Sequence, residues 1–338
     1  MNKTRIHAGL GVVLIAITGA AQAASAPTLD RAGLVKLADD YFAALVAHDP
    51  SRVPFAPDAK FVENVTRTKV GDGLVWKTAS SVPTTFKLVI PDPVSQEVGG
   101  IVVLGNGKGP TQLGFRLKVA NGRIVEAEHL VQGPREGQEL SPNLVTVRPP
   151  MLLEVPFEYA DSRGRLIHIA KSYYDALDNN NGYLAPFAAD CERRENGMRT
   201  APNGGPSLVG GVPGGGPPPA AGAPPRPTPP PKLLGLQSCT TQINSGAFQY
   251  ITTIEDRRVE IADTATGLAM GFSHFHHAMT QKKFRIYGDP SRDEVDMSTQ
   301  KPFDMPALHV YKIWGGEIHE IEAIGVLNVP FNAPTGWE

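Results

Sequence analysis

Histidines gather in one short stretch of the chain, Phe272-Ser273-His274-Phe275-His276-His277. If this stretch is a strand, His274 and His276 point to the same face and stand about 7 Å apart. Imidazoles change charge near neutral pH, so a pair of them among apolar side chains suits acid–base catalysis. Three interpretations stay open: ordinary structural histidines, a metal-free catalytic pocket, and a His-x-His metal site completed by His309 or a carboxylate.

The same alternation predicts the apolar surroundings of these histidines. Met270 and Phe272 share their face, and on a later segment His309 and Tyr311 share another. We expect these four side chains to contact a bound ligand. The metal interpretation is the weakest of the three because no close-spaced third ligand is evident, so we assign no metal ligands. No cofactor-binding motif is present either, so we expect no cofactor.

A second group of candidates surrounds Glu195. A carboxylate in an apolar pocket has a pKa raised toward neutrality, which suits a general base. Tyr173 would stabilise an oxyanion by donating a hydrogen bond, Arg199 would help to position it, and Asn196 would line the pocket. The alternatives are an ion pair between Glu195 and Arg199 that fixes a turn, and a Tyr173 that belongs to the core.

The elements that position these residues are written twice in the sequence. Residues 34–68 and 166–200 align without a gap at an offset of 132 and share 13 of 35 residues, and residues 117–128 match 311–322 at an offset of 194. Two copies are too few for a solenoid, so we predict two homologous domains. Their expected bounds are 28–141 and 159–338, with a crossover over 142–158.

Each copy begins with apolar residues at helical spacing, at Leu34, Tyr41 and Leu45 in the first, and continues as alternating strands. In the first copy Asn121-Gly122 separates two strands and is a strong hairpin signal. This order predicts an α+β fold in which a long N-terminal helix packs on one face of a curved antiparallel sheet.

The N-terminus and the cysteines indicate export. Residues 1–23 have the positive start, short apolar run and small-x-small end of a signal peptide, with an uncleaved anchor as the alternative. We expect a periplasmic or secreted chain that has no membrane segment after cleavage. In an oxidising compartment Cys191 and Cys239 favour a disulfide at the base of a Pro/Gly-rich insertion, residues 202–232, which we expect to be disordered.

Charge excludes one class of partner. The 32 basic residues are balanced by 34 acidic ones, and no Lys/Arg run stands out. We therefore expect no nucleic-acid binding.

Several motifs together resemble a known superfamily. The segments PFAPDAKFVEN and NGRIVEAEHL follow a long helix as in the nuclear-transport-factor-2-like, or SnoaL-like, superfamily. ENVTRT before GDGLVW, together with EDRRVEIAD and IHEIEAI, is similar to exported tandem members with no established general function. The resemblance implies two tandem cone-shaped domains, each with a pocket open at one end, and their pairing within the chain.

Members of this superfamily include ketosteroid isomerases, polyketide cyclases and dehydratases, and also binding or dimerising modules, so the fold leaves function open. The first copy has Gly100-Ile101-Val102 where the second has its histidines. We therefore expect a cofactor-independent lyase, isomerase or dehydratase that takes a small apolar or aromatic molecule in the second domain. The alternative is a non-catalytic ligand-binding or protein-interaction module, and a homo-oligomer stays open beside the monomer.

Overall fold

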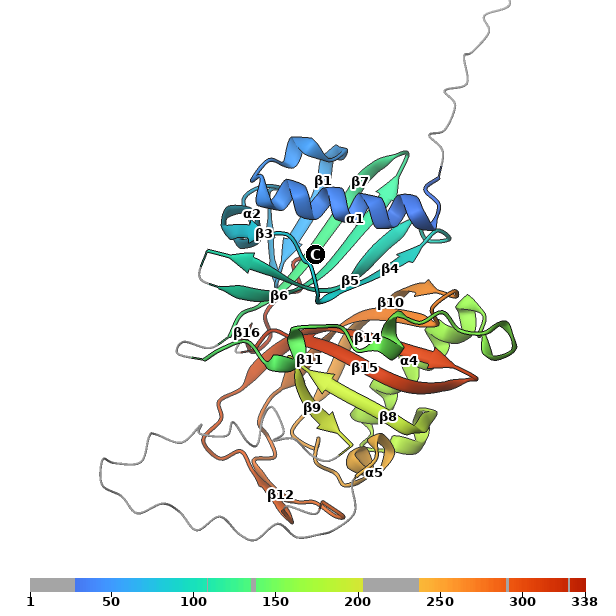
Figure 1. Ribbon diagram of the computed structural model, residues 1–338. Helices are drawn as coiled ribbons and strands as arrows, with labels where there is room; N and C mark the ends of the chain where they lie inside the picture. The colour runs from blue at the N-terminus through green and yellow to red at the C-terminus, as the bar shows by residue number, and fades with distance from the viewer. Residues whose placement is uncertain (1–27, 108, 135–137, 203–236, 290–291, 328) are drawn as a thin grey trace, which may run out of the picture.

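The computed structural model describes residues 28–107, 109–134, 138–202, 237–289, 292–327 and 329–338. Within these residues two seven-stranded sheets lie back to back, and each carries a long helix on the face turned away from the other sheet (Figure 1). The predicted α+β class is confirmed. The signal segment 1–23 and nearly all of the insertion 202–232 lie outside the described residues.

The first sheet and its helices occupy residues 31–132, here called the first unit. The helices are α1 (Arg31–Val46) and α2 (Leu74–Thr78), and the strands are β1 (Phe55–Glu63), β2 (Thr66–Thr68), β3 (Ala79–Ser81), β4 (Lys87–Asp92), β5 (Glu97–Asn106), β6 (Pro110–Ala120) and β7 (Arg123–Gln132). The strand order is β2-β1-β7-β6-β5-β3, and β4 also pairs with β5. Since β1 and β7 run parallel, the sheet is mixed and not purely antiparallel.

The second unit, residues 163–330, repeats this plan. Its helices are α4 (Arg163–Asp178) and α5 (Cys239–Asn244). Its strands are β8 (Phe187–Glu195), β9 (Met198–Ala201), β10 (Thr253–Asp263), β11 (Leu268–His277), β14 (Phe303–Trp314), β15 (Glu317–Gly325) and β16 (Val329–Pro330), and a separate hairpin joins β12 (Lys283–Arg285) to β13 (Glu294–Asp296). The main order is β10-β11-β14-β15-β8-β9.

The central strands of the two sheets correspond: β2-β1-β7-β6-β5 matches β9-β8-β15-β14-β11, and the β4–β5 pair matches β10–β11, whereas β3 and β16 have no counterpart among the described strands. α1 and α4, and likewise β1 and β8, lie 132 residues apart, which is the offset found in the sequence. Both helices begin with a side-chain cap, from Asp30 and from Ser162. The same topology therefore occurs twice, with a parallel β8–β15 pair matching β1–β7.

Each helix covers the inner face of its own sheet. Leu34, Tyr41 and Leu45 of α1 lie in one apolar core, and Leu166, Tyr173 and Leu177 of α4 lie in another. Helical spacing turns these residues toward the sheet, so burial of this stripe holds each helix in place.

The outer faces of the two sheets form a third core, here called the seam. It joins Leu88, Ile101 and Leu130 of the first unit to Met270 and Leu308 of the second. The connecting segment contributes as well: α3 (Pro149–Leu152) carries buried Met151, and Leu144 and Val147 before it are also buried, whereas Leu152, Leu153 and Val145 are exposed.

Ion pairs close the seam in a reciprocal way. Arg31, the first residue of α1, pairs with Asp263 at the end of β10, and Arg163, the first residue of α4, pairs with Asp92 at the end of β4, both at 2.8 Å. Such a reciprocal pattern is characteristic of a twofold interface. The C-terminus runs between the sheets (Figure 1), where Trp337 donates to Glu128 and lies under Arg116 and Arg258.

Cys191 of β8 and Cys239 of α5 form the expected disulfide. Both cysteines are buried and pack against Phe187. No helix within the described part of the chain has the length and apolar character needed to cross a membrane.

Candidate functional site

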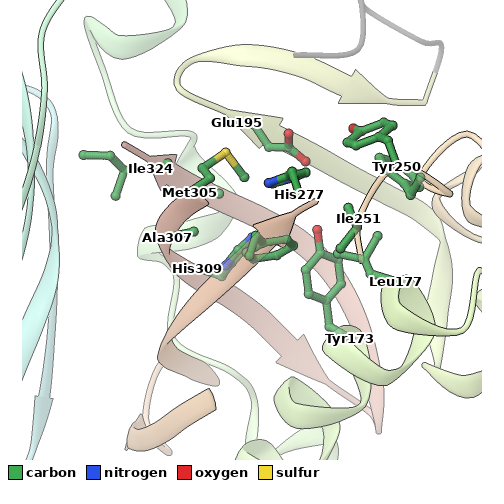
Figure 2. A pocket seen from close by; sticks show the side chains of 14 residues that line it. Tyr173, Leu177, Glu195, Tyr250, Ile251, His277, Met305, Ala307, His309 and Ile324 are labelled. Carbon is green, nitrogen blue, oxygen red and sulfur yellow. The ribbon is translucent and has the colours of Figure 1, made fainter. Parts of the chain in front are cut away.

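A small cavity of about 30 Å³ lies inside the second unit between α4 and its sheet. This volume holds about one or two water molecules. Its lining is mostly apolar but includes Tyr173, Glu195, His277 and His309, whose polar ends point toward a common space (Figure 2). Met305, Leu177 and Ile251 close the remaining sides.

Glu195 reaches the cavity from the end of β8. Its carboxylate lies 3.2 Å from the guanidinium of Arg193, which is buried and which also lies 3.4 Å from the Tyr173 hydroxyl. Burial raises the pKa of Tyr173 above its ordinary value, and the Glu195 charge adds to this while Arg193 opposes it. The hydroxyl therefore keeps its proton at neutral pH and can donate a hydrogen bond.

His277 at the end of β11 is fully buried and lies against the ring of Phe303, with ring centroids 4.2 Å apart. Neither ring nitrogen makes a well-aligned hydrogen bond within the described structure. Burial lowers the pKa of His277 to about 3, although backbone groups of Phe303 and Phe275 favour the protonated ring. A buried, neutral imidazole without a well-aligned hydrogen bond can accept one from, or donate one to, a polar group in the cavity.

His309 lies deeper, on β14. Burial, with a smaller effect of Arg193, lowers its pKa to about 3, so this ring is neutral too. Its Nδ1 is 3.4 Å from the Tyr174 hydroxyl.

His274, His276, Met270 and Phe272 were expected in this pocket and lie elsewhere. Met270 and Phe272 belong to the seam, while His274 lines a smaller cavity between the units. Strand alternation correctly groups these four residues, but their shared face is turned away from α4. Phe275 and His277 occupy the inner face instead.

Three other candidates also differ from their expected roles. Asn196 has a φ of 48°, and its side chain bonds both backbone groups of Gly325, so it shapes a turn as Asn64 does in the first unit. Arg199 is exposed, and the ion pair proposed for it is made by Arg193. Tyr311 is buried in the core beside the cavity, where its ring stacks on His309.

The first unit contains a polar chain that the sequence interpretation overlooked. The Tyr41 hydroxyl is 2.8 Å from His129 Nε2, and His129 Nδ1 is 3.3 Å from Glu63. Burial alone would raise the pKa of Glu63, but the hydrogen bond and charge of His129 and two backbone N–H donors outweigh it, and the net shift is downward. These donors, from Leu74 and Val75, show that Glu63 caps α2.

The histidine near the glutamate at the corresponding position stands on a different strand in each unit, on β7 in the first and on β14 in the second. His129 pairs with Glu63 across β1 and β7, and Ala323 pairs with Glu195 across β8 and β15. The imidazole of the second unit comes from the neighbouring strand as His309. The signal for this difference was present in the offset of 194, which aligns His129 with Ala323 and Phe115 with His309.

A family model described as "Domain of unknown function (DUF8021)" matches residues 27–130 and 159–325. The chain belongs to this family. The two matched segments overlap the two units of the structure, residues 31–132 and 163–330. A search of curated proteins found no match.

Solved structures with similar folds each match part of the chain. A protein from Methylobium petroleophilum with a cystatin-like fold has 19% identity and a TM-score of 0.27, with 33% of this chain and 84% of that chain covered. A protein from Jannaschia named as a putative SnoaL-like polyketide cyclase has 9% identity and a TM-score of 0.28, with 49% of this chain and 90% of that chain covered. An NTF2-like protein from Burkholderia thailandensis has 14% identity and a TM-score of 0.24, with 48% of this chain and 90% of that chain covered.

At these identities and TM-scores the likenesses say nothing about substrate or reaction.

Proposed function

We propose that the chain is an exported tandem SnoaL-like protein whose second unit binds a small apolar or aromatic molecule and moves a proton on it without a cofactor. The observation that carries this proposal is the buried His277, whose ring nitrogens lack aligned partners at the cavity lined by Glu195 and Tyr173. A ligand with one polar group would supply the missing hydrogen bond.

The roles follow from charge and protonation. Glu195, held beside Arg193, would accept a proton from an acidic C–H of the ligand. Tyr173 would donate a hydrogen bond to the oxygen that gains negative charge, and neutral His277 would orient the ligand. Return of the proton to another carbon gives an isomer, and loss of a neighbouring hydroxyl as water gives a dehydrated product.

The second candidate is a non-catalytic binding module that uses the same cavity, whose volume of about 30 Å³ is small for a ligand in either candidate. A ring-sized ligand requires the lining to move, and the unbranched Met305 is the side chain most suited to do so. In this candidate the same residues recognise the ligand and no bond changes.

One experiment separates the two candidates. Native mass spectrometry of the full chain would identify the bound molecule, and NMR in D₂O would follow deuterium exchange at its C–H groups. We expect Glu195→Gln to slow exchange by about 100-fold or more while the ligand still binds. Glu158→Gln, at an exposed position outside the cavity, is the matched control.

Binding without exchange in the wild type would select the non-catalytic module. Exchange at an unchanged rate in Glu195→Gln would remove Glu195 as the base. A cavity that takes up no molecule would contradict both candidates.

A further inference from the structure

A second set of histidines lies on the opposite face of the second sheet from the cavity. His274 and His276 are two residues apart on β11, and Asp304 lies opposite His276 on the neighbouring strand β14. The two imidazole rings are stacked, with centroids 4.8 Å apart and planes 9° apart. Each ring has one nitrogen close to the Asp304 carboxylate.

The ligand atoms of the three residues lie within 4.8 Å of one another. His276 Nδ1 is 2.9 Å from Asp304 Oδ1, and His274 Nε2 is 3.3 Å from Asp304 Oδ2. The His274 nitrogen lacks the alignment of a hydrogen bond and has no other partner in the described structure. A buried nitrogen aimed at a carboxylate without bonding it indicates a missing group between them.

Charge points the same way. The Asp304 side chain is fully buried, His274 is 3% exposed and His276 is 15% exposed. No lysine or arginine of the described residues forms an ion pair with Asp304, and Glu255 and Asp256 add further negative charge near the histidines. A buried carboxylate is costly unless a cation offsets it.

We propose that His274, His276 and Asp304 bind one divalent transition-metal ion, and that Zn²⁺ fits this site best. Two imidazoles and one carboxylate are a common ligand set for zinc, with water in the fourth position. Water and metal reach the site where His276 is partly exposed. This site is separate from the cavity and independent of its proposed function.

Outer contacts support the assignment. Glu255 Oε2 lies 3.7 Å from His276 Nε2, the nitrogen left free when Nδ1 binds metal. Metal-bound histidines usually donate their other N–H to such a carboxylate. The backbone N–H of Ala333 donates to Asp304 Oδ2, so the ion would join β11 and β14 to the C-terminal segment.

The test uses the full chain, stripped with a chelator and titrated with Zn²⁺ against a chromophoric zinc indicator. We expect one Zn²⁺ per chain with micromolar or tighter affinity, and no competition from excess Mg²⁺, which prefers oxygen ligands. His276→Gln and Asp304→Asn should each weaken binding at least about tenfold. His168→Gln, which removes an exposed histidine on α4, should leave it unchanged.

Native mass spectrometry gives the stoichiometry, and circular dichroism checks that each variant is folded. If Asp304→Asn fails to fold, His276→Gln decides, because its side chain is partly exposed. Absence of stoichiometric zinc in the wild type, or equal affinity in wild type and folded His276→Gln, would overturn the proposal.

Discussion

Tyr41 and Tyr173 occupy the same place in the two units but meet different partners. The Tyr41 hydroxyl contacts His129, whose other ring nitrogen contacts Glu63. The Tyr173 hydroxyl instead lies near Arg193, and Tyr173 lines the cavity. In the first unit Trp76 packs edge-on against Tyr41, with ring centroids 5.5 Å apart. A buried tyrosine at this position is thus compatible with a filled interior as well as with a cavity.

His277 should make the protein sensitive to acid. The pKa of His277 in the folded chain is about 3, below its ordinary value of 6.5. As the pH falls below 6.5, His277 is therefore protonated in the unfolded chain but stays neutral in the folded chain. The contribution of the neutral histidine to the free energy of unfolding is therefore fully present above pH 6.5. It declines as the pH falls to about 3, by up to about 1.4 kcal/mol per pH unit for each such histidine. His309 should add to the same decline.

Urea unfolding between pH 4 and 7 measures this effect. His277→Phe should show a shallower decline, because it removes one of the two groups while keeping a flat ring against Phe303. His168→Gln should keep the wild-type slope. Equal slopes for wild type and His277→Phe would contradict the assigned cause.

Of the residues predicted to share one pocket, Glu195, Tyr173 and His309 line the cavity, whereas His274 and His276 do not. Alternation shows which residues share a face and does not show which face is the inner one. Residue polarity shows which face is the inner one only when the other face is exposed to solvent. On β11 nine of ten residues are buried, so polarity does not distinguish its two faces. His129 was missed because a lone histidine in an ordinary strand pattern carries no signal of its own partners.

Elements were predicted more successfully than side-chain orientation. The two long helices, the meander strands and the disulfide follow from spacing, turn residues and cysteine count, since each is a local or pairwise signal. The short helices α2, α3 and α5 were not predicted. The parallel pairing of β1 with β7 was not foreseen, because it joins residues about 70 positions apart through the backbone. Phe61 opposite Ala127 illustrates such a contact.

The Cys191–Cys239 disulfide ties α5 to β8 and closes a loop with a sequence separation of 48 residues. By the chain-entropy estimate this closure stabilises the fold by about 4 kcal/mol. We expect the double variant Cys191→Ala/Cys239→Ala to lose about this free energy of unfolding in urea. Reduced wild type is the control, and a loss under about 1 kcal/mol would show that the unfolded chain is already constrained there.

The whole molecule depends on the seam, where two similar sheets pack through their outer faces. Its reciprocal pairs, Arg163–Asp92 and Arg31–Asp263, each join a partly exposed arginine to a buried aspartate. Asp92 also accepts from the backbone N–H of Ala262, so this carboxylate links the units twice.

Double-mutant cycles should reveal this linkage. For Arg163→Ala with Asp92→Asn we expect a coupling free energy of about 1–3 kcal/mol in urea unfolding, and a similar value for Arg31→Ala with Asp263→Asn. The exposed pair Lys36–Asp40 is a matched control, with an expected coupling of about 0.5 kcal/mol or less. Couplings across the seam no larger than this control would mean that the apolar core alone joins the units.

The seam also affects how the two units can diverge by mutation. When two identical subunits meet about a twofold axis, one gene change alters both sides at once, so an innovation useful on one side must be tolerated on the other. With both sides encoded in a single polypeptide, each codon acts once. The pair of His129 with Glu63 differs from the pair of Ala323 with Glu195, a difference that a single polypeptide permits and a dimer of identical subunits does not.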